Sequence, residues 1–427
     1  MLSTNRFRSL FRAVIATAAI SVLSILAVSV ETRAAAPIKV GFSLSQTGAG
    51  GPAGKQVILA LEIWRDDVNA KGGLLGRPVQ LVYYDDQSNP ANVPAIYTKL
   101  IQVDKVDLLI GPYATNMIAA AIPVIEDNNR TTVTMFGVGA NSKFHYKRYF
   151  SMLPYGPNAG HEFSRGFFEM AKAQRPKPKT VALVGADTEF GKISTDGARE
   201  NAKAAGFTIV YHRLFPPTMT DLAPVARAIK ATDPDIVFAA AYPPDTVALI
   251  RAASEIGLNP KMIGGTLVGM LITPLKIQLG PLMNGWLNNA EVYVPVPSLL
   301  TFPGVQDVLK KYHERARGQH IDPFGYNYAP LTYAAGQVLA TAVEATKSLD
   351  HAKLAHFIHT HSFSTVAGKI AFGPDGEWVK PRSILTQFQH ITDHDIRQIN
   401  DLKKWVVVWP PEYRTGNMIY PYAAARK

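Results

Sequence analysis

The chain has 427 residues, a formal net charge of +11 and no cysteine. The lack of cysteine excludes disulfides, thiolate metal sites, a thiol nucleophile and an attachment point for a lipid anchor. Basic residues are dispersed along the chain and form no basic face interleaved with aromatic residues, so we expect no nucleic-acid partner.

Residues 1–36 have the pattern of a secretory signal peptide. Three arginines between positions 6 and 12 precede an apolar stretch at 13–30, and small residues permit cleavage after Ala34 or Ala36. An uncleaved membrane anchor is the alternative, because eighteen apolar residues nearly span a bilayer. We expect export and cleavage, which leave a periplasmic chain of about 390 residues, long enough for two domains.

Strands alternate with helices along the remaining chain, which is typical of an α/β fold with parallel sheets and right-handed crossovers. One set of strands is expected at 38–42, 79–83, 106–110 and 131–136. A second set is expected at 180–184, 208–211, 236–240 and 262–263. The last third is less regular, with helices expected at 305–317, 328–347 and 351–361, strands at 290–294, 384–391 and 405–409, and an irregular tail at 410–427. The first two sets resemble two copies of one architecture.

The stretch 106–128 combines a strand, a sharp loop and a helix. Its apolar run at 108–110 predicts a buried strand, and Gly111 with Pro112 ends it. A loop at 113–116 follows, and Thr115 or Asn116 is the expected helix N-cap. In open α/β sheets such loops bind ligands, and the amino end of a helix favours an anionic group. An ordinary turn is the alternative interpretation.

Several motifs are excluded by their spacing. The glycine-rich loop at 43–54 matches neither a phosphate loop nor a dinucleotide fingerprint, so we expect no nucleotide cofactor. The four histidines between 351 and 361 do not place three side chains on one helix face, so we expect no metal. No nucleophile elbow is present, and we expect no catalytic residue and no cofactor. An exported hydrolase is therefore disfavoured.

The loops after successive strands are rich in hydroxyls, amides and aromatic rings. These residue types suit a cleft that holds a small molecule without changing it. The expected ligand-binding residues are Thr47, Tyr113, Ala114, Thr115, Phe136, Gly137, Phe190, Tyr242 and Thr266.

Residues 69–86, NAKGGLLGRPVQLVYYDD, resemble the signature segment of the branched-chain amino acid (Leu/Ile/Val-binding) type of periplasmic solute-binding proteins, the receptors of ABC importers. Further similarities are the segments IGP at 110–112, DTEFG at 187–191, DPDIV at 233–237 and KIAFGPDG at 369–376. The resemblance implies a small-molecule ligand, a membrane permease as partner and a monomeric receptor.

The same resemblance implies two Rossmann-like lobes, the type I periplasmic binding protein fold, joined by three hinge crossings. By the resemblance the crossings lie near 153–156, 286–294 and 367–372. The N-terminal lobe would comprise 37–153 and 294–366, and the C-terminal lobe 154–293 and 367–409.

The resemblance also implies roles for individual residues. Thr115 matches the hydroxyl that takes a ligand carboxylate, and the loop 136–139 matches one whose N–H groups assist. Phe190 stands where the family has a tyrosine, and Tyr242 matches a second tyrosine. The segment 264–267 has no acid where the family has the glutamate that binds a ligand ammonium.

A buried ammonium without a counter-charge would cost several kcal/mol. We therefore expect a carboxylate-bearing solute without an α-amino group, such as an aromatic acid held between aromatic side chains. If Asp187 or Glu189 supplies the missing acid, the ligand would be a branched-chain or other amino acid or an amide. Ligand sensing without transport is a further alternative.

Overall fold

The computed structural model describes residues 35–426 except 218 and 292–297. The expected signal peptide therefore lies almost wholly outside the described residues, as does the end of the crossing expected at 286–294. The chain divides into the units Met1–Ala36 and Pro37–Lys427, and everything below concerns the second unit.

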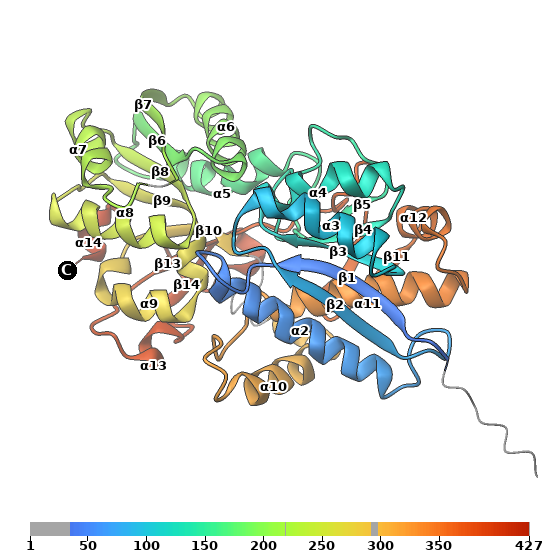
Figure 1. Cartoon of the computed structure of the whole chain (residues 1–427). Coiled ribbons are helices and arrows are strands. Elements are labelled where there is room, and N and C mark those ends of the chain that lie inside the picture. Colours follow the sequence, from blue (N-terminus) through green and yellow to red (C-terminus); the bar gives the residue numbers. More distant parts are fainter. Residues whose placement is uncertain (1–34, 218, 292–297, 427) are drawn as a thin grey trace, which may run out of the picture. The chain divides into compact units, whose positions relative to one another are not determined.

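Five parallel strands form the sheet of the first lobe, in the order β2-β1-β3-β4-β5 (Figure 1). The strands are β1 (Ile38–Leu44), β2 (Val79–Asp85), β3 (Leu108–Tyr113), β4 (Thr132–Met135) and β5 (Tyr149–Ser151). All residues of β3 and β4 are buried, as expected of apolar strands covered by helices on both faces.

The helices of this lobe come from two distant parts of the chain. The first part contributes α2 (Gly51–Asn69), η1 (Pro90–Asn92), α3 (Val93–Gln102) and α4 (Thr115–Asp127). The second part contributes η4 (Leu299–Thr301), α10 (Val305–Ala316), α11 (Ala329–Thr346) and α12 (His351–Thr360). Helix α11 packs on α2 and β4, which brings the late segment onto the first sheet.

Seven strands form the sheet of the second lobe, in the order β14-β13-β10-β9-β8-β6-β7. The strands are β6 (Thr180–Ala186), β7 (Thr208–Phe215), β8 (Ile236–Ala241), β9 (Met262–Leu267), β10 (Leu287–Glu291), β13 (Ile384–Phe388) and β14 (Trp405–Trp409). Strands β6 to β10 are parallel and repeat the strand order of the first sheet. Strand β13 is antiparallel to β10, and β14 is antiparallel to β13. The prediction of two Rossmann-like lobes is confirmed.

The second sheet is covered by helices from the middle and the end of the chain. These are α5 (Ala159–Ala173), α6 (Glu189–Ala204), α7 (Ala223–Ala231), α8 (Pro243–Glu255), η2 (Val268–Leu271), α9 (Thr273–Leu279), η3 (Gly280–Met283) and α13 (Ile396–Ile399). The final residues form η5 (Pro411–Tyr413) and α14 (Tyr422–Ala425). The short strand β5 and the hairpin of β11 (Ser362–Thr365) and β12 (Gly368–Ala371) have no counterpart among the predicted elements, because three or four residues carry little periodicity.

The loop expected at 113–116 is wrong in its extent. Strand β3 continues through Gly111 and Pro112 to Tyr113, because an irregularity in its pairing with β4 absorbs these two residues. Helix α4 begins at Thr115, so Ala114 alone joins strand and helix, with φ 81°. The expected N-cap at Thr115 or Asn116 is also wrong, since Ala114 occupies that position and offers no side-chain hydrogen bond.

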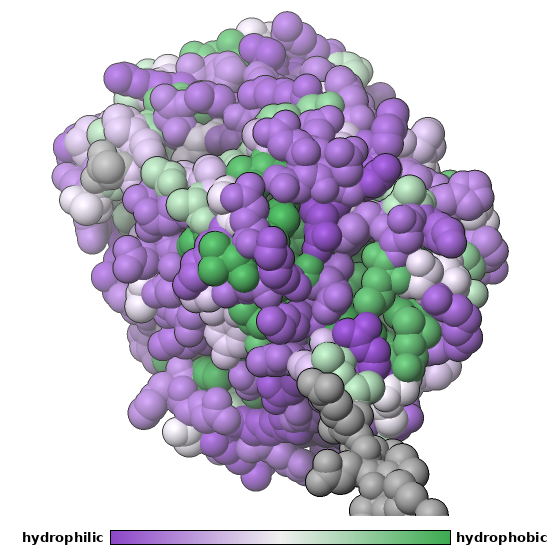
Figure 2. Space-filling view, turned by 45° about the vertical axis from the view of Figure 1, so that its right-hand side comes forward, coloured by the Kyte–Doolittle hydropathy of each residue, from purple (hydrophilic) through white to green (hydrophobic). Residues whose placement is uncertain are grey.

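The face in Figure 2 is mainly hydrophilic, and its hydrophobic groups are divided among smaller patches. Among the described residues, the large apolar side chains that are exposed are Val103, Val379 and Leu402. Of the helices in the described part of the chain, none combines the length and the apolar character needed to cross a membrane.

Close packing joins the two parts of the first lobe at Trp64 of α2 and Gly336 of α11. Trp64 is 1% exposed, and a Cβ atom at Gly336 would lie 2.4 Å from Cδ2 of its ring. The absence of a side chain at Gly336 therefore allows α11 to lie against the indole.

We expect Gly336→Ala to lower the free energy of unfolding by about 1–3 kcal/mol, because the added methyl overpacks this contact. The loss should appear in urea unfolding although alanine has the higher intrinsic helix propensity, by about 1 kcal/mol. Thr341→Ala, at an exposed position of the same helix, is the control and should be neutral or slightly stabilising. A Gly336→Ala protein at least as stable as the unsubstituted chain would contradict the packing argument.

Candidate functional site

Two adjoining cavities lie where the loops after β3, β6 and β8 meet. The inner cavity has a volume of about 40 Å³, and its thirteen lining residues include no Asp, Glu, Lys or Arg. Seven of them are aromatic: Tyr113, Phe136, Tyr155, Phe163, Phe190, Tyr242 and Tyr328. The outer cavity measures about 440 Å³ and shares Tyr113, Ala114 and Tyr242 with the inner one. Both sheets have the strand order that places ligands at the carboxyl ends of such strands.

Thr115, the first residue of α4, lines the inner cavity and is 1% exposed. Its Oγ1 accepts a hydrogen bond of 2.9 Å from the backbone N–H of Val138, in the loop after β4. A hydroxyl group that accepts in this way still has its own hydrogen to donate. Thr115 therefore presents a donor to the cavity instead of capping its helix.

Among the helices α2, α4, α6 and α8, α4 is the one whose first turn has neither a side-chain cap nor a proline. Helix α8 begins with Pro243 and Pro244, which have no N–H groups, and in α6 the Thr188 hydroxyl accepts from Gly191 at 3.1 Å. The first N–H groups of α2 bond to the backbone of its own loop, and α4 has no side-chain cap. The first-turn N–H groups of α4 lack acceptors within the helix and favour an anion.

Two non-glycine residues with positive φ flank this helix end. Ala114 has φ 81° and Phe136 has φ 58°, and both line the inner cavity. Such conformations cost free energy and persist where the surrounding packing enforces them, which is common at binding sites. Here both residues belong to the wall of one cavity, Ala114 directly before α4 and Phe136 directly after β4.

Aromatic side chains from the two lobes face each other across the inner cavity. In the first lobe the ring of Tyr328 lies 4.9 Å from that of Phe136, and its hydroxyl lies 3.1 Å from that of Tyr113. In the second lobe Phe190 stacks on Tyr242 at 4.8 Å. A hydrogen bond of 2.7 Å from the Tyr242 hydroxyl to Asn116 Oδ1 crosses between the lobes.

Burial raises the pKa of two tyrosine hydroxyl groups that line the inner cavity, those of Tyr113 and Tyr242. It raises the pKa of Tyr113 to about 12, an effect that the hydrogen bond with Tyr328 partly opposes. Burial likewise raises the pKa of Tyr242 well above its ordinary value. Both hydroxyl groups are therefore neutral near pH 7 and can donate hydrogen bonds.

The outer cavity has an acidic lining. Asp187 and Asp245 belong to it, together with Ser45, Ser88 and Asn116, and no Lys or Arg does. Asp187 pairs with Lys192 at 2.8 Å, and both side chains are about half exposed. Asp245 lies in the first turn of α8 and is 9% exposed.

The predicted site residues are divided by the structure into two groups. The inner cavity is lined by Tyr113, Ala114, Thr115, Phe136, Phe190 and Tyr242. Gly137 lies between two lining residues, and a Cβ atom there would lie 2.4 Å from Ile118. Thr47 lies outside the inner cavity, exposed and bonded to Asp85 at 2.7 Å, and Thr266 is fully buried within β9. A ligand-binding role for these residues stays a prediction.

Sequence reasoning missed several lining residues. Tyr155 and Phe163 follow the first sheet, Val268 and Leu271 belong to η2, and Tyr328 precedes α11. The aromatic run FGYNY at 324–328 was the available signal for Tyr328, but it stands in an irregular segment with no strand end to locate it. Asp245 was missed because it follows the two prolines that begin α8.

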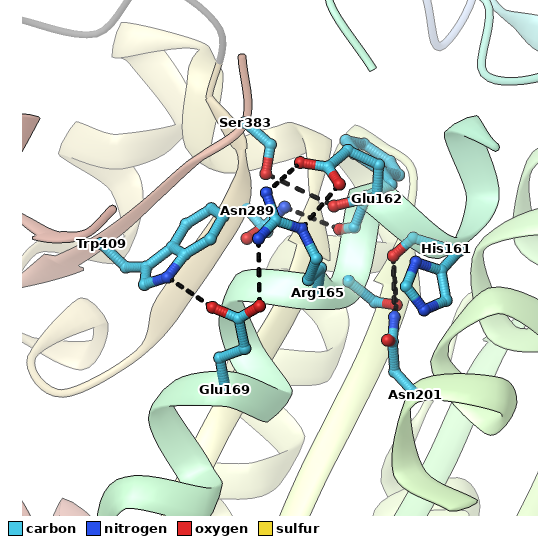
Figure 3. A network of polar contacts seen from close by, with 10 residues as sticks. His161, Glu162, Arg165, Glu169, Asn201, Asn289, Ser383 and Trp409 are labelled. Atoms are coloured by element: carbon cyan, nitrogen blue, oxygen red, sulfur yellow. Dashed lines mark hydrogen bonds and ion pairs between the residues drawn. The ribbon is translucent and has the colours of Figure 1, made fainter. Parts of the chain in front are cut away.

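A polar network joins α5 to strands β10 and β14 of the second lobe (Figure 3). Arg165 forms two hydrogen bonds with Glu162, of 2.7 and 2.8 Å, and one of 3.0 Å with Glu169. Trp409 of β14 donates to Glu169 at 2.9 Å, and Asn289 of β10 donates to the Phe163 carbonyl at 2.7 Å. These hydrogen bonds hold α5 against β10 and β14.

Two further hydrogen bonds involve Pro154 and Tyr155, which follow the first sheet. The Tyr155 hydroxyl donates to the Asn289 carbonyl at 3.2 Å, and the Arg382 N–H donates to the Pro154 carbonyl at 2.6 Å. Tyr155 also lines the inner cavity, so the inner cavity adjoins these hydrogen bonds. The described part of the chain contains no group of three or more His, Asp or Glu side chains that could hold a metal ion.

Comparisons with known proteins agree with this two-lobed architecture. An amino acid binding protein of Pseudomonas aeruginosa is 25% identical over 366 residues, covering 84% of this chain and 91% of that protein. The structure of a leucine binding protein from Thermotoga maritima has a TM-score of 0.70 at 20% identity and covers 83% of this chain and 96% of that one. An ABC transporter solute-binding protein from R. palustris in complex with benzoate has a TM-score of 0.70 at 21% identity, covering 87% and 95%.

The fold and the cleft between its lobes thus define a solute-binding protein of the two-lobed class. Residues 37–389 match the periplasmic binding protein family over most of the chain. The chain belongs to this family, within the branched-chain amino acid group whose relatives include the Leu/Ile/Val-binding proteins.

Burial raises the pKa of Asp245 from its ordinary value of 3.8 to about 6, and a hydrogen bond from the Tyr242 backbone partly opposes the shift. The folded protein therefore binds this proton more tightly than the unfolded chain, and stability falls as the pH rises from about 4 to 6. We expect the unfolding free energy of the unsubstituted protein, relative to Asp245→Asn, to fall by about 2–3 kcal/mol across this window.

Denaturant unfolding of both proteins at several pH values measures this difference. Asp221→Asn, at an exposed position, controls for general charge effects. A difference that stays constant between pH 4 and 6 would mean that Asp245 titrates normally.

Proposed function

We propose that this protein is the periplasmic receptor of an ABC importer and that it holds a carboxylate-bearing, ring-containing solute in the inner cavity. The observation that carries the proposal is the uncapped amino end of α4, which opens onto a space walled by aromatic rings and free of charged side chains. In that surrounding an anion finds donors, and an ammonium finds no counter-charge.

The acidic end of the solute would bind beside Thr115. The hydroxyl of Thr115 has a hydrogen to donate, and Thr115 belongs to the uncapped first turn of α4. Hydrogen bonds to charged groups contribute about 1.5–3 kcal/mol each. Two such bonds and a buried ring are enough for a micromolar dissociation constant, which corresponds to about 8 kcal/mol.

The ring would lie between the aromatic groups of the two lobes. A water needs roughly 10–15 Å³ of such cavity volume, so the 40 Å³ of the inner cavity accommodates only a few waters. A six-membered ring therefore enters when the lobes separate and the Tyr242–Asn116 bond opens. Binding is then coupled to hinge motion, and the closed form is the one a permease would recognise.

A second candidate is an amino acid, because acids line the outer cavity. Asp187 and Asp245 adjoin the inner cavity through Tyr242 and could oppose a ligand ammonium. The names of the leucine and amino acid binding relatives fit this candidate. It requires a solute that extends from Thr115 into the outer cavity.

Export of the chain, docking on a permease and release of an unaltered solute belong to the same proposal. The support is the charge and apolar pattern of residues 1–36 and the family to which the chain belongs. Mass spectrometry of protein recovered from the periplasm should give a mature chain that begins after Ala34 or Ala36. Protein found only in the membrane, with residues 1–36 retained, would favour an anchor.

Isothermal calorimetry with benzoate, methyl benzoate and leucine tests the ligand class. We expect micromolar binding of benzoate and at least hundredfold weaker binding of methyl benzoate, because the ester has no charge for the amide groups of α4. Micromolar binding of leucine, without binding of benzoate, would replace the first candidate by the second.

The role of Thr115 is tested with two substitutions. Thr115→Val keeps the approximate shape but loses both the donor and the acceptor of the Val138 N–H, so benzoate affinity should fall about tenfold to hundredfold. Thr115→Ser keeps the hydroxyl and is the matched control, with affinity within a few-fold of the unsubstituted protein. Equal affinities in all three proteins would exclude Thr115 from the carboxylate site.

A further inference from the structure

Among the described residues, the polar contacts that bridge the lobes around the cleft include three that involve side chains. Besides Tyr242 and Asn116, Lys143 pairs with Glu189 at 2.6 Å, and Asp322 Oδ2 accepts from the backbone N–H of Thr273 at 2.6 Å. Lys143 is 68% exposed, and an ion pair so open to water contributes little. Asp322 and Thr273 are 6% and 2% exposed, so theirs is a buried hydrogen bond to a charged group, of the stronger kind.

Asp322 is held firmly within the first lobe. Its other carboxylate oxygen accepts from the Phe324 N–H at 3.0 Å, and its carbonyl accepts from the Tyr312 hydroxyl of α10 at 2.9 Å. Helix α10 packs on α2 and α11 of that lobe. The carboxylate is therefore oriented before it meets the second lobe.

Thr273 is held equally firmly within the second lobe. It begins α9, which packs on α8 and α13, and no side chain of the preceding Ile272 caps that helix. The N–H of Thr273 therefore has no local side-chain acceptor, and Asp322 supplies one from the opposite lobe. Opening of the lobes would leave both groups to water.

Both partners stand close in sequence to residues that line the inner cavity. Val268 and Leu271, just before Thr273, form part of its wall, and Tyr328, six residues after Asp322, forms another part. The bond thus joins two walls of the ligand space that belong to different lobes. Closure around a solute and formation of this bond require the same approach of the lobes.

We infer that Asp322 is a positioning residue for ligand capture, which stabilises the closed form through its bond to Thr273 without touching the solute. The inference depends on two hinged lobes and on no particular ligand class. Loss of the carboxylate should lower the ratio of closed to open molecules by about tenfold.

The test uses spin labels in the full-length mature protein. Because the chain has no cysteine, Lys71→Cys and Arg227→Cys place one label on an exposed position of each lobe. Distance distributions are measured for the labelled parent, Asp322→Ala and Asp322→Asn, each without solute, with millimolar benzoate and with millimolar leucine. We expect Asp322→Ala to shift the distribution toward the open form in at least one condition, and Asp322→Asn to shift it less, because the amide oxygen still accepts.

Asp350→Ala is the matched control. Asp350 accepts from the Lys353 N–H at 2.9 Å and caps α12. Like Asp322, it accepts from a backbone N–H at the start of a helix, but both partners belong to one lobe. It should lower the melting temperature without altering the label distances. Identical distributions for Asp322→Ala and the parent in all three conditions would overturn the inference. A shift without any response to benzoate would retain the inference while the proposed aromatic acid fails.

Discussion

The proposed binding mode depends on one feature, the amino end of α4, which has neither a side-chain cap nor a proline in its first turn. Three other helix ends around the cleft are closed by proline, by a threonine hydroxyl or by their own loop. The amide groups of α4 have no such partner, and Thr115 bonds to Val138 instead of capping its own helix. We propose that these first-turn amide groups select an acidic solute, because they lie beside a cavity whose lining includes no Asp, Glu, Lys or Arg.

The two lobes together form the walls of the inner cavity beside the amino end of α4. Both lobes repeat one strand order, so each contributes the carboxyl ends of its strands, and the loops of one lobe meet those of the other. The first lobe contributes the donors with Tyr113, Phe136 and Tyr328, and the second contributes Phe190 and Tyr242. The network of Arg165 joins α5 to β14 within the second lobe.

The alternation of apolar runs with helices predicted the two lobes, because buried parallel strands need apolar residues on both faces. It also predicted lining residues at the ends of strands, such as Tyr113, the last residue of β3, and Tyr242, which follows β8. The sequence pattern failed to predict features that depend on tertiary contacts. The bulge at Gly111 and Pro112 moved the start of α4, Thr266 became part of β9, and Tyr328 entered the cavity from a distant irregular segment. Asp245 was also missed, because its burial and its place in the lining of the outer cavity become apparent only in the folded chain.

The central claim is that an acidic group lies on the amides beside Thr115. The most direct measurement is a crystal structure of protein purified from its own host together with the solute that it retains. The account predicts an acidic group of that solute within about 3.2 Å of Thr115 Oγ1 and of the first-turn N–H groups of α4. A solute without an acidic group, or one whose acidic group lies away from α4, would contradict it.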